Sequence, residues 1–271
     1  MMNSLSGALN SRNQAGSPTS MIKNLMRSDS IKNRFDEVMG AKAPQFMASI
    51  TNLVNSNQDL QHVDAMSVVA SAMVAATLDL PIDPNLGYMY IVPYRGQAQP
   101  QMGYKGYIQL ALRTGQYKHI NALPVYDDEV KSWNPLTEEL EYESSGTSHD
   151  NQTPAGYVGY FQLINGFEKT TYWTYDQINS HRQKFSKMSS KTDPTGVWKS
   201  NFDAMALKTV LRNLISKWGI MSIEMQQAFV KDERPQEFDH ETGEIQDVQE
   251  VEAEEENVAP ETQGSTDKKE E

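Results

Sequence analysis

The spacing of apolar residues changes twice along this chain of 271 residues, and those changes limit the folds that the chain can adopt. Apolar side chains recur every three to four positions in residues 18–78, alternate with polar ones in much of 117–173, and return to helical spacing in 194–231. Helices, then strands, then helices predict an α+β fold rather than a doubly wound parallel sheet. We expect an antiparallel β-meander packed with helices.

Turn and cap signals set the boundaries of these segments. Asn165-Gly166 favours a tight hairpin turn, and Thr174 followed by Gln177 has the form of a helix capping box. The longest predicted helix is basic and ends before Gly219. Predicted helices cover 18–39, 42–56, 64–78, 104–114, 174–185, about 194–218 and 222–231, and predicted strands cover 87–94, 117–126, about 140–143, 157–164 and 168–173.

Acidic residues are concentrated at the C-terminal end of the chain. Residues 232–271 contain 3 Lys or Arg and 16 Asp or Glu, whereas residues 1–231 contain 21 and 20. Residues 169–217 contain nine Lys or Arg and three Asp. Because charges more than ~10 Å apart are largely screened, this stretch can attract a polyanion despite the chain's net charge of −12. We therefore expect a flexible N-terminus at 1–17, one folded domain at 18–234, and an acidic, disordered tail at 235–271.

The sequence lacks the usual signals of several cofactor sites. There is no cysteine, which excludes disulfides and thiolate zinc sites, and the five histidines stand far apart. There is no glycine-rich phosphate loop and no Gly-x-Gly-x-x-Gly motif. No signal peptide and no run of roughly 20 apolar residues is visible. We expect a soluble, cytoplasmic protein that uses no cofactor.

The predicted helix 104–114 carries a polar face suited to a nucleic-acid backbone. Three polar side chains recur every four residues, and its two cations stand ~12 Å apart along the axis. Glycines on both sides of the first lysine leave room for a phosphodiester, and two tyrosines offer stacking faces. An ordinary amphipathic helix with a solvated basic face explains the same pattern. The candidate contacts here are Tyr104, Lys105, Tyr107, Gln109 and Arg113.

The predicted helix 194–218 offers a second set of candidates. Lys208 and Arg212 are four residues apart, so their charges repel, and a bound phosphate would relieve that repulsion. Phe202 and Trp198 either stack on bases or, as their helical spacing indicates, belong to the core. The remaining candidates are Thr209 beside the basic pair and Lys184, Lys187 and Lys191 in the preceding segment.

An acidic cluster raises a competing hypothesis of metal-dependent nuclease chemistry. Asp127-Asp128-Glu129-Val-Lys131 ends in a Glu-x-Lys pattern, but the sequence between Asp83 and Asp127 has no acidic residue to supply an upstream metal ligand. A little further on, Glu139, Glu141 and Glu143 alternate with apolar residues as on the solvated face of a strand.

Three blocks of sequence together resemble the RecT family of phage recombinases. The first is Asp79-Leu-Pro-Ile-Asp-Pro-Asn-Leu-Gly-Tyr-Met-Tyr-Ile-Val-Pro-Tyr94. The second is Gln101-Met-Gly-Tyr-Lys-Gly-Tyr107 with Arg113-Thr-Gly115, and the third runs from Trp198 through Ala204-Met-Ala-Leu-Lys-Thr-Val-Leu-Arg212. They occur in the family's order and span about 60–220. The resemblance is close to RecT proteins of phages of Gram-positive bacteria.

The resemblance implies an ATP-independent single-strand annealing protein of homologous recombination, in which residues 18–234 form the DNA-binding, annealing and oligomerisation domain. It implies that the protein binds single-stranded DNA and the annealed duplex intermediate, forms a ring or helical filament of its own copies, and works with a phage exonuclease and the host single-strand binding protein. It also implies a basic groove, with Lys105, Arg113, Lys208 and Arg212 as first contacts and Arg182, Lys184, Lys187, Lys191 and Lys199 as further ones.

Two other function classes stay open, namely a metal-dependent nuclease and a structural filament protein that does not pair DNA. The acidic tail has three possible roles: it competes with DNA for the basic groove, recruits another protein, or keeps the protein in solution.

Overall fold

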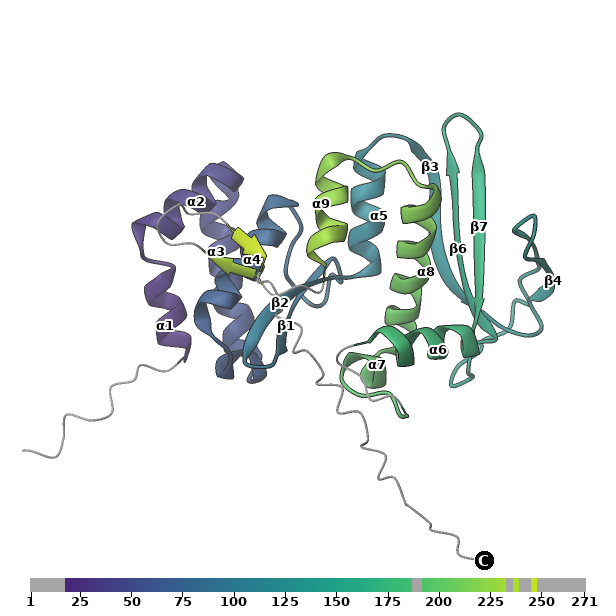
Figure 1. The fold of residues 1–271 in the computed structure, drawn as a ribbon, viewed down its shortest axis with the longest axis horizontal. Coiled ribbons are helices and arrows are strands. Elements are labelled where there is room, and N and C mark those ends of the chain that lie inside the picture. The colour runs from purple at the N-terminus through teal and green to yellow at the C-terminus, as the bar shows by residue number, and fades with distance from the viewer. Residues whose placement is uncertain (1–17, 187–191, 233–235, 239–244, 248–271) are drawn as a thin grey trace, which may run out of the picture.

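The computed structural model describes residues 18–186, 192–232, 236–238 and 245–247. The predicted flexible segment 1–17, Lys187, Lys191 and most of the acidic tail lie outside these residues. Figure 1 shows a helical end built from the N-terminal part of the chain and, at the other end, a three-stranded sheet covered by helices.

The N-terminal helices surround the buried helix α4, Ala65–Thr77. Around it lie α1 (Pro18–Leu25), α2 (Asp29–Met39) and α3 (Ala43–Ser56), with 3₁₀ turns at Gly40–Lys42 and Asp59–His62. Helix α4 starts at Asp64, whose carboxylate accepts from the backbone N–H of Ser67 at 2.7 Å. Because α4 buries apolar side chains on all sides, it forms the centre of this part of the core.

A β-hairpin joins the helical end to the rest of the molecule. Strands β1 (Met89–Tyr94) and β2 (Gln97–Met102) pair antiparallel, with Met89 opposite Met102. The hairpin is fixed to α4 because the backbone N–H of Ala98 donates to Ser67 Oγ at 2.7 Å. The sequence predicted only the first strand, since alternating glutamines and a proline disguise a second strand that is almost entirely buried.

Helix α5, Tyr104–Arg113, follows directly and packs closely on the loop before β1. A Cβ at Gly103 would clash with the carbonyl oxygen of Gly87, and a Cβ at Gly106 would clash with that of Tyr88. These glycines therefore serve a close approach of backbone to backbone, not the approach of a phosphodiester that the sequence analysis expected.

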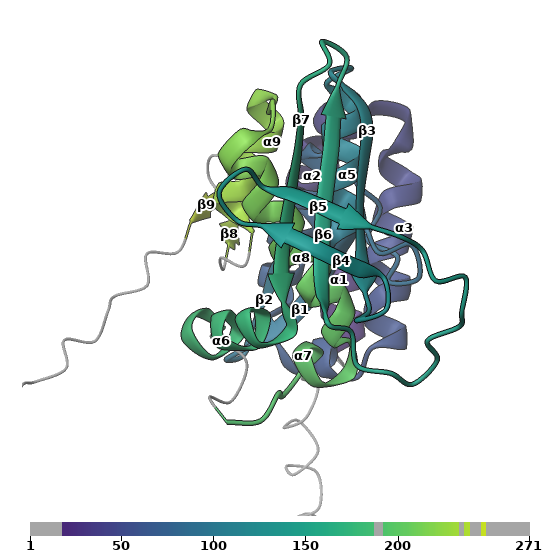
Figure 2. The same cartoon turned by 90° about the vertical axis from the view of Figure 1, so that its right-hand side faces the viewer.

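The main sheet consists of β3 (Tyr117–Val125), β6 (Gly156–Leu163) and β7 (Glu168–Thr174), antiparallel in the order β3-β6-β7. The predicted Asn165-Gly166 turn joins the last two strands, with Gly166 at φ 89°. Strands β4 (Val130–Asn134) and β5 (Glu139–Tyr142) form a separate hairpin that crosses one face of this sheet (Figure 2). The sequence predicted β5 but missed β4, its partner.

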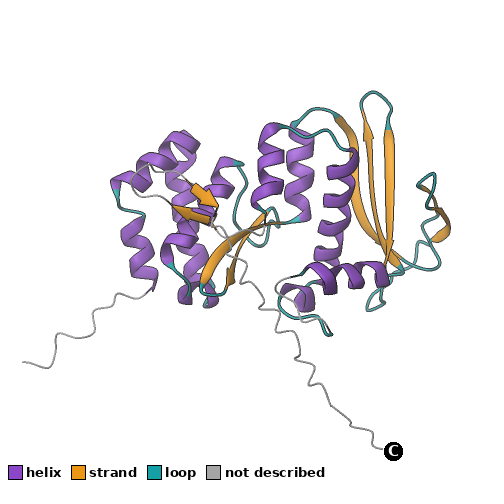
Figure 3. Ribbon diagram, viewed as in Figure 1, coloured by secondary structure: helices purple, strands orange, loops and turns teal. Residues whose placement is uncertain are grey.

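Four helices complete the fold. They are α6 (Tyr175–Phe185), α7 (Val197–Ser200), α8 (Phe202–Trp218) and α9 (Ile223–Lys231). Helix α8 covers the sheet face opposite the β4–β5 hairpin and approaches so closely that a Cβ at Gly159 would lie 2.9 Å from Val210 Cγ1. The α+β class is thus confirmed (Figure 3). The predicted helix 194–218 is interrupted at Asn201, whose extended φ of −152° separates α7 from α8.

Two short strands lie within the segment that was expected to be disordered. Strands β8 (Gln236–Phe238) and β9 (Ile245–Asp247) pair antiparallel beside α4. In the ranges that the structure describes, no helix has the length and apolar character needed to cross a membrane.

Candidate nucleic-acid interface

One cleft in the described part of the chain combines basic, amide and aromatic side chains. It has a volume of about 630 Å³ and is lined by residues of β2, β7 and α6 to α9, with the residues that directly follow α6 and α9. Three cationic side chains and one carboxylate face it. The lining residues are Gln99, Gln101, Trp173, His181, Arg182, Phe185, Ser186, Val197, Trp198, Met205, Lys208, Thr209, Arg212, Asn213, Ser216, Phe229 and Asp232.

The lysine predicted to hold phosphate is paired with a carboxylate. Lys208 is 4% exposed, and its ammonium lies 3.1 Å from Asp232 at the end of α9. The same carboxylate accepts from the backbone N–H of Met102 at 2.8 Å and from the Tyr107 hydroxyl at 2.6 Å. Lys208 therefore ties α8 to α5, β2 and α9 and adds little positive charge to the surface of the cleft.

Arg212 is the exposed cation of this cleft. Its guanidinium donates to the carbonyl of Phe229 at 3.1 Å and lies 5.7 Å from the centre of the Phe229 ring. Both of these contacts are with uncharged groups. Phe229 in turn packs edge-on against the buried Tyr107, with ring centroids 4.8 Å apart, so the ring beside Arg212 is held in place.

Arg182 has a structural position on α6. It is 1% exposed, its Nε donates to Asn179 at 2.9 Å, and its Nη2 donates to the carbonyl of Thr192 at 3.1 Å. It thereby connects α6 to the segment that leads into α7. Lys184 on the same helix is exposed and lies 5.2 Å from the Phe185 ring.

Aromatic side chains that the sequence analysis did not select line another part of the cleft. Trp173 at the end of β7 meets His181 of α6 edge-on at 5.4 Å, and His181 lies 4.6 Å from Phe185. The sequence offered one signal for this cluster: His181 and Phe185 are four residues apart in a predicted helix and so lie next to each other on one face. Gln99 and Gln101 were missed because β2 itself was missed.

The candidates on α5 do not line the cleft. Lys105 is exposed, Gln109 is half-buried, and Tyr104 packs against the core beneath α8. Arg113 donates to the carbonyls of Leu78 and Asp79 at 2.5 and 2.7 Å and so caps the end of α4. Tyr107 is 0% exposed, so its ring has no face for a DNA base.

The other predicted contacts are divided between the core and the surface. Phe202 stacks on Tyr175 at 4.8 Å and meets Trp198 edge-on at 5.2 Å, which favours the core role considered for both residues. Thr209 lines the cleft, with its hydroxyl bonded to the carbonyl of Met205 at 2.9 Å. Lys199 is exposed on α7.

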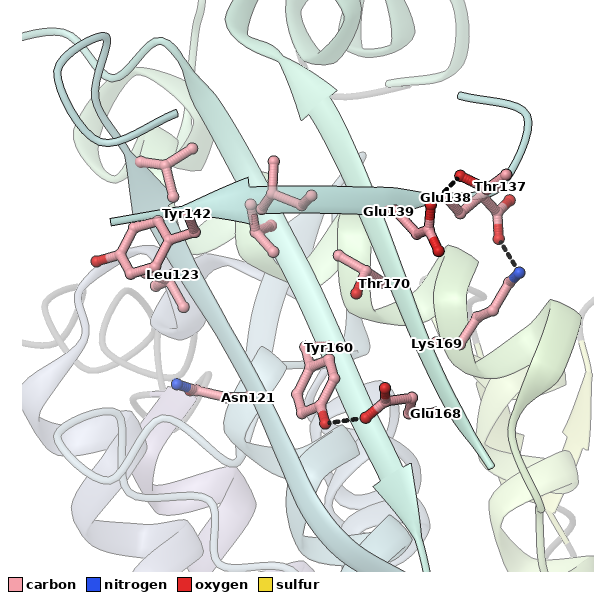
Figure 4. Close-up of a pocket in the computed structure, with 13 residues that line it drawn as sticks. Asn121, Leu123, Thr137, Glu138, Glu139, Tyr142, Tyr160, Glu168, Lys169 and Thr170 are labelled. Atoms are coloured by element: carbon pink, nitrogen blue, oxygen red, sulfur yellow. Dashed lines mark hydrogen bonds and ion pairs between the residues drawn. The ribbon is translucent and has the colours of Figure 1, made fainter. Parts of the chain in front are cut away.

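A second cavity, of about 540 Å³, lies between the β4–β5 hairpin and the main sheet (Figure 4). Three carboxylates line it, those of Glu138, Glu139 and Glu168, against the single ammonium of Lys169. Lys169 and Lys217 lie 2.8 and 3.2 Å from Glu138. Burial alone would raise the pKa of Glu138, but these two cations hold that pKa below its usual value. The acidic lining disfavours phosphate, so we take the first cleft as the candidate interface.

The acidic cluster considered for metal chemistry supports a turn instead. Glu129 accepts from the backbone N–H of Tyr126 at 3.1 Å and from the Tyr142 hydroxyl at 3.3 Å. Asp128 pairs with His149 at 3.0 Å. Among the residues that the structure describes, no group of three or more His, Asp or Glu side chains is placed to hold a metal ion.

Comparison of the sequence with known proteins identifies its relatives. The model of the RecT family matches residues 44–249. The chain is 56% identical over 216 residues to the uncharacterized protein YqaK of Bacillus subtilis strain 168, covering 80% of this chain and 73% of that protein. It is 27% identical over 212 residues to protein RecT of Escherichia coli K12, covering 73% of this chain and 76% of that protein.

Proposed function

Because the chain belongs to the RecT family, a family of single-strand annealing proteins in DNA recombination, we propose that it binds single-stranded DNA in the cleft between β2, β7 and α6 to α9 and pairs complementary strands there without ATP. The observation that carries this proposal is the combination of an exposed arginine, a set of amides and hydroxyls, and an array of aromatic rings in one cleft. Sites for single strands without sequence preference combine these elements.

The mechanism follows from the charges of the cleft. Cations hold the sugar-phosphate backbone and release counterions, so binding requires no reading of base edges. If the bound strand keeps its pairing edges exposed, a second strand tests Watson-Crick pairing, and the free energy of pairing takes the place of ATP. The annealed product then binds more tightly than duplex added from solution, whose rigid B-form does not fit a cleft shaped around one strand.

The predicted contacts have different roles in this proposal. Arg212 makes the main phosphate contact, and the exposed Lys184 and Lys199 extend the positive field along α6 and α7. Lys208 and Arg182 position the helices that form the walls. Lys105 and Arg113 lie outside the cleft, and we propose that Lys105 contacts DNA as it leaves the cleft. Arg113 acts through the end of α4, which it caps.

Assembly into a ring or helical filament is a further part of the proposal. Exposed apolar side chains gather near the β6–β7 turn and the loop between α8 and α9: Ile164, Phe167, Trp218, Ile220 and Ile223. Phe167 and Trp218 lie 6.5 Å apart, and such a patch is typical of a protein contact. We propose that a second copy covers this patch, and that an exonuclease which exposes single strands works with the assembly.

The acidic segment after the body competes with DNA for the cleft in this proposal. Its first carboxylate, Asp232, already neutralises Lys208. Truncation after Asp247 keeps β8 and β9 and removes 9 of the 16 acidic residues beyond position 231. Stronger nonspecific binding of single strands by the truncated chain is the expected result, and unchanged binding leaves recruitment of a partner as the role of this segment.

The test of function is a fluorescence annealing assay with two complementary oligonucleotides and no ATP. The intact chain accelerates annealing, Arg212→Gln loses most of that acceleration, and the matched control Lys32→Gln, an exposed lysine of α2, retains it. Cleavage of the strands on addition of magnesium would instead support the nuclease hypothesis. Assembly that is indifferent to DNA, without acceleration, would support a structural filament protein.

A further inference from the structure

The cleft has two chemically different walls, and we infer that Trp173, His181 and Phe185 form a stacking wall for unpaired bases while the polar wall on α8 holds the phosphates. This inference rests on the proposed function and adds the orientation of the bound strand. It also moves base stacking away from Tyr107, which the sequence suggested and the structure buries.

The stacking wall is built by two elements. Trp173 at the end of β7 and His181 on α6 meet at 5.4 Å with an interplanar angle of 76°, and Phe185, one turn further along α6, lies 4.6 Å from His181. All three side chains line the cleft. Phe185 is 60% exposed, although a phenylalanine gains free energy from burial. A row of rings that ends in an open phenylalanine gives a flat base a partner to stack on.

The polar wall is one face of α8. Thr209, Arg212, Asn213 and Ser216 line the cleft at a spacing of three to four residues. They extend over ~10 Å of helix. The face carries one cation and several hydrogen-bond donors and has no carboxylate among these four residues, which suits a phosphodiester. A strand between the two walls has its phosphates toward α8 and its bases toward α6.

The arrangement has a consequence for the choice of nucleic acid. Stacking is tolerant of sequence because every base has a π-face, but it requires bases that are not already stacked in a duplex. The stacking wall therefore selects single strands over double strands, which a purely electrostatic groove does not do. Lys184, 5.2 Å from the Phe185 ring, adds a cation beside the stacked base.

The experiment separates bases from phosphates. Two fluorescent probes of equal length are titrated with the full chain by anisotropy: an oligothymidylate strand, and a strand in which every base is replaced by a tetrahydrofuran abasic site. Both probes carry the same phosphates and differ in their bases, so a variant that loses affinity for oligothymidylate alone has lost a contact to the bases. Phe185→Ala removes the ring, Phe185→Tyr retains a ring, and Arg212→Gln removes a charge from the opposite wall.

Phe185→Ala is expected to weaken binding of oligothymidylate about 5-fold to about 150-fold and to leave the abasic probe within about 2-fold. Phe185→Tyr keeps the original affinity for both probes. Arg212→Gln weakens both probes by a similar factor, because it acts on phosphate.

If Phe185→Ala weakens binding of both probes equally, or weakens binding of neither, the inference of a stacking wall is overturned. If the intact chain binds neither probe, the proposed function fails and the inference fails with it. If Arg212→Gln weakens both probes while Phe185→Ala weakens neither, the cleft still holds the phosphates and only the inference is lost. Circular dichroism of each variant confirms that the fold is intact, as expected for a side chain this exposed.

Discussion

Replacement of Asp232 by alanine is expected to destabilise the whole protein, although this residue lies at the start of the acidic segment. Its carboxylate lies 3.1 Å from the ammonium of Lys208 and accepts from the Met102 N–H and the Tyr107 hydroxyl, at 2.8 and 2.6 Å. The side chains of Lys208 and Asp232 are 6% and 1% exposed. Asp232→Ala leaves the buried ammonium of Lys208 without its carboxylate. It also removes the acceptor of two buried donors, the Met102 N–H and the Tyr107 hydroxyl.

The magnitude follows from the burial of the pair. Removing one partner of a buried ion pair costs ~3–5 kcal/mol, and the two lost hydrogen bonds belong to the same network, so they are not added separately. This is a large share of the ~5–15 kcal/mol that stabilises a typical domain. With a urea dependence of ~2–3 kcal/mol per molar, the unfolding midpoint falls by about 1–2 M.

The assay is urea unfolding followed by tryptophan fluorescence. Asp232→Asn keeps an amide oxygen as acceptor and should lose less stability than Asp232→Ala. Lys208→Met combined with Asp232→Asn should cost less than the two changes summed, because no charge then stays buried. The matched control, Asp36→Ala on the exposed face of α2, should change stability by less than ~0.5 kcal/mol. A loss below ~1 kcal/mol for Asp232→Ala would refute the reasoning.

Two further predictions concern the hairpin and the glycines. Since Lys169 and Lys217 lower the pKa of Glu138, this carboxylate stabilises the fold at neutral pH and loses that contribution as the pH falls through its depressed pKa. Glu138→Gln should therefore show a smaller loss of stability in acid than the intact chain in thermal unfolding across pH, and parallel curves would contradict this. Gly103→Ala should cost at least ~1–3 kcal/mol in urea unfolding because its Cβ would clash with the Gly87 carbonyl; a neutral effect would show that the backbone approach is not needed.

Local signals in the sequence predicted local structure well. The capping box at Thr174 is present, with the Thr174 hydroxyl accepting from the Gln177 N–H at 3.2 Å and the Gln177 side chain accepting from the Thr174 N–H at 2.9 Å. The Asn165-Gly166 turn is also confirmed. Each depends on residues within a few positions of one another, so their chemistry alone determines the outcome.

Features that depend on distant residues were not predictable in this way. Lys208 was selected as a phosphate contact because its charge repels Arg212 within one helix, but Asp232, 24 residues away, neutralises it. Arg113 likewise finds the carbonyls of Leu78 and Asp79 in space. Periodicity shows which face of a helix is polar, but whether that face meets solvent, DNA or another element depends on how the elements pack.

The candidate interface was predicted in part for the same reason. The sequence identified α8 and Arg212, which line the cleft, because the family resemblance and the basic character both pointed there. It did not identify Trp173, which meets His181 only when the end of β7 packs beside α6. The stacking wall forms only when the chain folds.

The most direct test of the central claim is the salt dependence of single-strand binding, measured by anisotropy for the intact chain, Arg212→Gln and Lys32→Gln. If Arg212 neutralises a phosphate in the cleft, Arg212→Gln weakens binding and reduces the slope of log affinity against log salt by ~0.7, while Lys32→Gln leaves both unchanged. An unchanged slope for Arg212→Gln, or equal losses for the two variants, would contradict the assignment of the cleft as the DNA-binding site.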